Sequence, residues 1–311
     1  MRKWLVALVL SALFSSPAHS QTNPLWHGQK VKNYLPHMTW PEVEDLLSRT
    51  DMVIVPVPAI EQHGPQLPIG TDYFTGEELA KLIAQKTDVL VAPILLPGIS
   101  PYHMEFPGTI TLSADTVQRV YFEAVQSLIH HGFRRFMILT SHAGNQNVAR
   151  YILDRINQET PGIAVELNDA AAPFLLKPRR QEEKQFDRHA GVGETSGGLY
   201  LFPNLVDMSK AGKNEVILPD HLQKALPQLI AGDDTATTVF LAEALKPKDT
   251  GKHTSTREMT KTGVWSKQDT REASAGRGRQ HCEAFVDASV QFIERWKVLK
   301  PVKPLAERRN Y

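Results

Sequence analysis

Four apolar, β-branched runs dominate the hydrophobic pattern of the chain. They cover residues 52–60, 89–96, 135–142 and 162–169. Each run has the length of a strand and is nearly continuous rather than alternating, as a strand buried on both faces requires. The pattern therefore predicts strands in the interior of a mostly parallel sheet.

Segments with helical periodicity lie between these runs. Residues 71–86 open with a Thr-Asp cap signal and repeat apolar residues on one face. A second segment begins at Ser113, a candidate N-cap, and ends at Gly132, and a third covers residues 145–159. Each combines a polar start with apolar residues three and four apart, which indicates an amphipathic helix.

The alternation of strand and helix predicts right-handed βαβ units, and hence a mostly parallel sheet with helices on both faces. We expect one α/β domain over residues 25–300, closed by a helix at 284–296. The polar segment 246–279 is interpreted as a surface loop that covers part of the fold, and the tail 301–311 should be loosely held.

Composition narrows the class of partner. The 311 residues include 35 basic and 34 acidic ones, a formal net charge of +1. Nothing in this balance favours nucleic acid or an anionic membrane surface, so a small molecule is the expected partner. Cys282 is the single cysteine, which excludes an internal disulfide, and its place near the start of an amphipathic helix favours a packed thiol.

The N-terminus has the pattern of a secretory signal peptide. Arg2 and Lys3 precede an apolar run from Trp4 to Phe14, and small residues lead to a cleavage site after Ser20. The run is about eleven residues long, whereas a membrane-spanning helix needs about twenty. We expect an exported, periplasmic protein with no membrane span.

Potential metal ligands cluster where two predicted strands end. Glu61 and His63 follow the first strand, and because they are two apart in an extended segment they point to the same side. Asp72 opens the next helix, and His142 follows the third strand. The carboxyl ends of parallel strands meet at one edge of a sheet. Two carboxylates and two imidazoles there would suit a divalent ion such as Zn, Mn or Fe.

Further candidates are weaker when taken alone. Glu194 and His189 lie in a polar, Gly-rich segment, and His103 precedes a Pro-Gly turn. Glu194 is equally well explained as a carboxylate at a helix N-terminus, stabilised by the helix dipole. His103 is equally well explained as an ordinary loop residue.

Four sequence motifs, taken together, are specific enough to indicate a protein family. In order, PAIEQHGPQLPIGTD, HMEFPGTITLS, SHAGNQNVA and HAGVGETSGG resemble the creatininase (creatinine amidohydrolase) family, as does TGVWSKQDTREASAGRGRQHCEAFVDASVQFI near the C-terminus. The likeness covers most of residues 35–295. It implies a three-layer α/β/α sandwich, a site for one or two divalent ions, frequent hexamer assembly and hydrolysis of a non-peptide amide, often in a small ring.

The resemblance also assigns metal ligands. Glu61 and His142 would hold one metal, Asp72 would bridge two, and His63 would hold the second. In creatininase a Glu stands two residues after the equivalent of His142, but this chain has Gly144 there. Glu194 is the expected replacement.

His189, which opens its motif, would be the general acid or base, since a histidine suits proton transfer near neutral pH. Water activated by metal would attack the amide carbonyl. Asn145, with the backbone of residues 143–146, and His103 are expected to contact the substrate or support the site.

The substrate is left open. Phe186, Asp187 and Arg188 do not match the residues that hold creatinine, so creatininase activity in the strict sense is not favoured. Two alternatives remain: a hydrolase of the same fold that acts on a formamide-type substrate, and a non-catalytic, metal-dependent periplasmic ligand-binding protein.

Overall fold

The four apolar runs form one parallel sheet in the order β2-β1-β3-β4. Its strands are β1 (Met52–Val57), β2 (Leu90–Val91), β3 (Arg135–Thr140) and β4 (Ile163–Glu166). The computed structural model describes residues 29–175, 186–217 and 255–309, with short stretches between 224 and 238. The predicted signal peptide and residues 246–254 lie outside the described residues.

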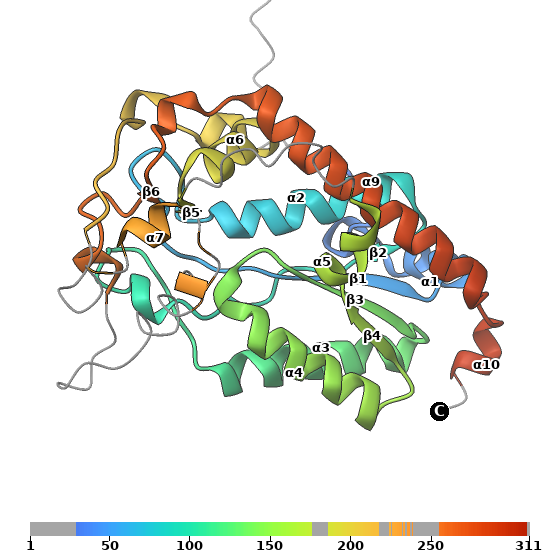
Figure 1. Ribbon diagram of the computed structural model, residues 1–311. Helices are drawn as coiled ribbons and strands as arrows, with labels where there is room; N and C mark the ends of the chain where they lie inside the picture. The colour runs from blue at the N-terminus through green and yellow to red at the C-terminus, as the bar shows by residue number, and fades with distance from the viewer. Residues whose placement is uncertain are drawn as a thin grey trace, which may run out of the picture. The chain divides into compact units, whose positions relative to one another are not determined.

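Helices cover both faces of this sheet. The main ones are α1 (Trp40–Arg49), α2 (Thr71–Lys86), α3 (Ala114–His131), α4 (Gln146–Glu159), α6 (Val192–Leu201) and α9 (Ala275–Leu299). Short helices are α5 (Leu167–Ala171), α7 (Leu226–Ile230) and α10 (Leu305–Arg309). In Figure 1, α2 and α9 lie on one side of the sheet, and α3 and α4 lie on the other. The predicted α/β/α layering is confirmed.

The strand order explains this distribution of helices. The chain passes from β1 outward to β2 through α2, returns to β3 through α3, and continues outward to β4 through α4. Right-handed crossovers in opposite directions must place their helices on opposite faces. The direction reverses between β1 and β3, and a ligand site in such a sheet lies where the loops after those strands diverge.

Both faces of the sheet are buried at β1. Val53, Val55 and Val57 pack with α1, α3 and α4, and Met52 and Ile54 point to the opposite face. All residues of β1 are buried, which is why its sequence is apolar without alternation.

The boundaries of the elements differ from the sequence prediction in ways that have local causes. β1 ends at Val57, directly before Pro58, and β2 keeps only two residues before Pro93. Helix α2 has Gly70 as its N-cap, so the Thr-Asp pair lies inside the first turn instead of capping it. Ser113 and Gly132 do cap α3 as predicted.

A second sheet was not predicted. β5 (Asp187–His189) pairs antiparallel with β6 (Trp265–Ser266), which belongs to the polar segment that was interpreted as a surface loop. That interpretation is wrong for the described part of the segment, where Thr256 and Met259 are buried. The polar composition of the segment gives no sign of this burial. Its hydroxyl groups form hydrogen bonds with one another and with nearby carbonyls inside the fold.

The final helices also differ from expectation. α9 begins at Ala275, where Ser274 accepts a hydrogen bond from Arg277 N, well before the predicted start at 284. Beyond it, α10 docks on the fold instead of lying loosely. Arg308 is 3% exposed, and its guanidinium donates to Leu47 O and, over 2.7 Å, to Gly132 O. A buried cation that donates to main-chain carbonyls fixes the tail over residues 305–309.

Among the described residues, no helix is both long enough and apolar enough to cross a bilayer.

Replacing Arg308 by Met should destabilise the protein by about 3 kcal/mol, because buried carbonyls lose a charged donor. Urea unfolding followed by circular dichroism measures this change. Arg309 is exposed, so Arg309→Met should cost no more than about 0.5 kcal/mol. Equal stability of the two variants would show that the tail does not contribute to the fold.

Candidate metal centre

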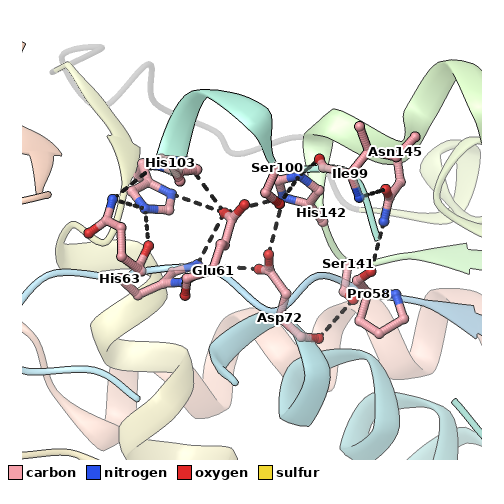
Figure 2. A network of polar contacts seen from close by, with 12 residues as sticks. Pro58, Glu61, His63, Asp72, Ile99, Ser100, His103, Ser141, His142 and Asn145 are labelled. Atoms are coloured by element: carbon pink, nitrogen blue, oxygen red, sulfur yellow. Dashed lines mark hydrogen bonds and ion pairs between the residues drawn. The ribbon is translucent and has the colours of Figure 1, made fainter. Parts of the chain in front are cut away.

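The loops after β1 and β3 bring the predicted ligands together. Glu61, His63 and Asp72 are each less than 5% exposed, and His142 is 6% exposed. Figure 2 shows Glu61, Asp72 and His142 pointing toward one another. Glu61 Oε1 lies 3.3 Å from His142 Nδ1 and 3.9 Å from His63 Nε2.

Asp72 lies between the two histidines. Its Oδ1 is 3.4 Å from His63 Nε2, and its Oδ2 is 3.1 Å from His142 Nδ1. One carboxylate whose two oxygens face different imidazoles has the arrangement that a ligand shared by two ions requires. Ser141 helps to place this residue, because its hydroxyl donates to Asp72 O over 2.8 Å.

Main-chain carbonyls fix which nitrogen each imidazole presents. His142 Nε2–H donates to Ile99 O over 2.9 Å, and His63 Nδ1–H donates to Glu61 O over 3.1 Å. A neutral imidazole that donates from one nitrogen carries a lone pair on the other. When each ring is neutral, its lone pair therefore faces the carboxylates, as metal-ligating histidines require.

Glu194 reaches the same centre from the first turn of α6. Its Oε2 is 3.7 Å from His63 Nε2 and accepts a hydrogen bond from Ala190 N over 2.5 Å. Gly144 lies close by, and a Cβ there would stand 2.4 Å from His142 Nε2 and 2.8 Å from Ile99 O. The backbone of this chain thus has no room for a Glu at position 144, and Glu194 supplies the carboxylate from a different segment.

His189 also points into the centre. Its Nε2–H donates to Gln62 O over 2.7 Å, and its Nδ1 lies 3.6 Å from Glu61 Oε1. Its lone pair can therefore accept a proton or a metal. The described residues contain three groups whose ligand atoms lie within 4.8 Å of one another: Glu61, His103 and His189; His63, His189 and Glu194; and Glu61, His63 and Asp72.

The residues present fit a divalent ion. Glu61 Oε2, His63 Nε2 and Asp72 Oδ2 are buried without a hydrogen-bond partner. Buried polar atoms are normally satisfied, so orphans that converge from three residues indicate a missing ligand. Carboxylate and imidazole donors suit transition metals.

In the metal-free centre, protons on two histidines balance the negative charge of the carboxylates. Burial alone would lower the pKa of His63, but the charges of Asp72, Glu194 and Glu61 outweigh it and raise the pKa to about 10. Burial likewise opposes protonation of His142, yet Glu61 and Asp72 hold its pKa well above the usual value. Both imidazoles are cationic in the metal-free centre at neutral pH.

The pKa values of the two remaining histidines, His103 and His189, are shifted in the opposite direction. Burial lowers the pKa of His103 to about 4, and burial, followed by electrostatic coupling to the neighbouring rings of His103 and His63, lowers the pKa of His189. Their rings stack with centroids 4.3 Å apart. Both are neutral at physiological pH.

Asn145 does not face the centre; its side chain forms hydrogen bonds with the main chain of the loops that surround it. Its side chain is fully buried, donates to Val57 O and Pro58 O over 3.1 and 2.9 Å, and accepts from Ile99 N over 3.0 Å. Of the two roles expected for it, contact with substrate or support of the site, these main-chain contacts favour the second. It ties the end of β1 to the loop whose Ile99 carbonyl orients His142.

Three contributors were missed from the sequence. Tyr102 places its hydroxyl 3.3 Å from His142 Nε2, and burial with the charges of Glu61 and Asp72 holds its pKa well above the usual value. Gln62 and Thr256 contact His103. Gln62 could have been noticed because it lies between two ligands, but nothing local to Thr256 signals a role.

Comparison with known proteins identifies the family of the chain. The model of the family described as creatininase, creatinine amidohydrolase, matches residues 36–293. The chain belongs to the creatininase family. The predicted family is confirmed, and so, at the level of the family, is the predicted class of enzyme, a hydrolase of C–N bonds.

Three relatives illustrate the range of the family. A 3-dehydro-scyllo-inosose hydrolase of Thermotoga maritima is 29% identical over 62% of this chain and 64% of its own length. A creatinine amidohydrolase of Pseudomonas putida is 27% identical over 57% of this chain and 75% of its own length. A mycofactocin precursor peptide peptidase of Mycolicibacterium smegmatis is 26% identical over 81% of this chain and 88% of its own length.

Solved structures support the fold. A crystal structure of creatinine amidohydrolase superposes with a TM-score of 0.61 at 21% identity, covering 88% of this chain and 99% of that one. A Bacteroides fragilis protein described only as a candidate creatinine amidohydrolase gives a TM-score of 0.62 at 22% identity over 89% of this chain and all of that one.

Uptake of Zn²⁺ by the metal-free protein at pH 7 should release at least two protons, because His63 and His142 must be neutral to coordinate. Glu194 adds to this release, because burial raises the pKa of its carboxyl to about 7. Affinity should fall as the pH is lowered, since protons then compete better. Calorimetric titration in buffers of different ionisation enthalpy measures the release. His130→Gln, on the exposed surface of α3, should not change it, and heats independent of the buffer would contradict the charge assignment.

Asp72→Ala should remove most of the metal that the purified protein carries, because both oxygens of this carboxylate face ligands. Elemental analysis of protein never exposed to chelator measures the content. Glu78→Gln in the same helix is the control and should retain metal. Full retention in Asp72→Ala would refute a shared ligand at this position.

Proposed function

We propose that this protein is an exported, metal-dependent amidohydrolase that cleaves the C–N bond of a non-peptide amide. Cyclic amides with a small ring are among the candidate substrates. The observation that carries the proposal is the convergence of Glu61, Asp72 and Glu194 with imidazoles whose lone pairs are aimed at them by main-chain carbonyls. A non-catalytic binding protein would not need a further neutral histidine, His189, with its lone pair facing the same point.

Glu61, Asp72 and His142 would hold one ion, and Asp72, His63 and Glu194 a second. Creatininase structures described as a Zn-Zn type and as a Mn form support zinc or manganese as the metal, with iron as a further candidate. A divalent ion in this centre would supply Lewis acidity to a water molecule and to the amide carbonyl.

His189 would carry the proton. Its Nε2–H is held by Gln62 O, so Nδ1 is free to accept a proton from the attacking water as oxygen bonds to the carbonyl carbon. The same proton then passes to the leaving nitrogen as the C–N bond breaks. The ring keeps its orientation throughout, because the anchoring hydrogen bond is on the nitrogen that does not react.

The signal sequence supports a periplasmic location after cleavage following Ser20, where the substrate would be an external or envelope amide. Assembly into a homo-oligomer such as a hexamer follows from the family resemblance. A formamide-type substrate is the alternative within this fold, and the peptidase relatives, which match over 81% of this chain, add a peptide bond as a second candidate.

A hydrolysis screen of the mature protein over lactams, hydantoins, creatinine, formamides and short peptides, with Zn, Mn and Fe supplied separately, tests the proposal. We expect metal-dependent release of amine from a cyclic or other non-peptide amide. His189→Gln should abolish this release and retain metal, whereas loss of both would make His189 a ligand. Cleavage of peptides alone, or no cleavage by metal-loaded protein, would contradict the proposed activity.

A further inference from the structure

Gln62 lies next to the candidate metal centre, between two of the residues that form it. In the extended loop after β1 its neighbours Glu61 and His63 point into the centre, so Gln62 points the other way. Its side chain is 5% exposed. The amide Nε2 lies 3.0 Å from His103 Nδ1 and 3.0 Å from His189 Nε2.

The orientation of this amide is fixed by its other contacts. Gln62 Oε1 accepts from Gly64 N over 3.0 Å, and Nε2 donates to Gly263 O over 3.1 Å. Exchanging the two atoms would set oxygen against a carbonyl and NH₂ against an N–H. Gly263 has φ +87°, and a Cβ there would lie 1.9 Å from Gln62 Oε1, so the backbone that holds the amide requires glycine.

The proton positions around Gln62 then follow. His189 Nε2 lies 2.7 Å from Gln62 O, which can only accept, so Nε2 carries the proton. The Gln62 amide cannot donate to a nitrogen that is itself a donor. Its remaining N–H therefore donates to His103 Nδ1, which leaves the ring proton of neutral His103 on Nε2.

Thr256 touches the same nitrogen. Its hydroxyl lies 2.6 Å from His103 Nδ1 and 2.7 Å from Tyr102 O, and its one proton serves one of these acceptors. The competing arrangement, in which Nδ1–H donates to Thr256, leaves an N–H of Gln62 facing two ring donors. An unsatisfied donor in so buried a place is unfavourable.

We propose that Gln62 is a positioning residue that holds His103 as the Nε2–H tautomer, so that His103 donates a hydrogen bond to the carbonyl oxygen of the substrate. Its Nε2 faces the centre, 3.6 Å from Glu61 Oε1. A protonated nitrogen cannot ligate a metal, which distinguishes His103 from His63, His142 and His189. A neutral imidazole aimed where negative charge develops stabilises the transition state of acyl transfer.

This role rests on the proposed amide hydrolysis, but the tautomer can be measured without a substrate. In protein labelled with ¹⁵N-histidine, metal-free and zinc-loaded, the ring ¹⁵N shifts report which nitrogen is protonated, and His103→Gln identifies the signals. We expect His103 to be protonated at Nε2 and not at Nδ1. Protonation at Nδ1 in the unaltered protein would overturn the proposal, whether or not the protein hydrolyses any amide.

Gln62→Glu tests the cause. A carboxylate in place of the amide accepts instead of donating, so His103 Nδ1 should become protonated. Gln66→Glu is the matched control, because Gln66 is equally buried but its amide binds Ala190 O and Thr195, not a histidine. His103 signals that stay unchanged in Gln62→Glu, or that change equally in Gln66→Glu, would contradict the assignment.

Once the hydrolysis screen has identified a substrate, Gln62→Met should lower kcat about 100-fold with little change in KM, as expected for a hydrogen bond that matters mainly in the transition state. Gln66→Met should lower kcat much less. Equal losses in the two variants would reduce Gln62 to a structural role.

Discussion

The structure depends on carboxylates that the fold brings together at one point: Glu61 and Asp72 are buried, and the partly exposed Glu194 joins them from α6. Buried like charges repel one another and lose hydration, so they persist only where positive charge is close. In the metal-free protein the protons on His63 and His142 provide it, and a divalent ion would replace them. Folding of this region and metal loading are therefore coupled through the same residues.

The loops around the centre are irregular for a reason that follows from hydrogen bonding. Carbonyls inside a helix or a sheet are already occupied, whereas carbonyls in a loop broken by Pro and Gly are free to accept. Ile99, Glu61 and Gln62 each use such a carbonyl to hold one imidazole. The Pro- and Gly-rich sequence of these loops thus determines which nitrogen of each ring faces the candidate metal centre.

Gly144 and Glu194 show how a carboxylate can reach the centre from a segment other than the loop after β3. Gly144 packs against His142 Nε2 and the hydroxyl of Tyr102, so this loop has no space for a side chain. Glu194 reaches the centre from α6, a segment that is distant in sequence. The first turn of α6 is a favourable place for a carboxylate, because the helix dipole stabilises its charge.

The sequence by itself determined the parallel sheet, the cap residues of α3 and the placement of Glu61, His63, Asp72 and His142, because strand periodicity and the rule for strand ends are local or topological constraints. Family resemblance added His189 and Glu194. Only the tertiary structure decided that Asn145 faces away from the centre, that the tail docks through Arg308, and that Thr256 reaches His103. These contacts join segments far apart in the chain, and polar residues that satisfy one another in the interior leave no periodic signal in the sequence.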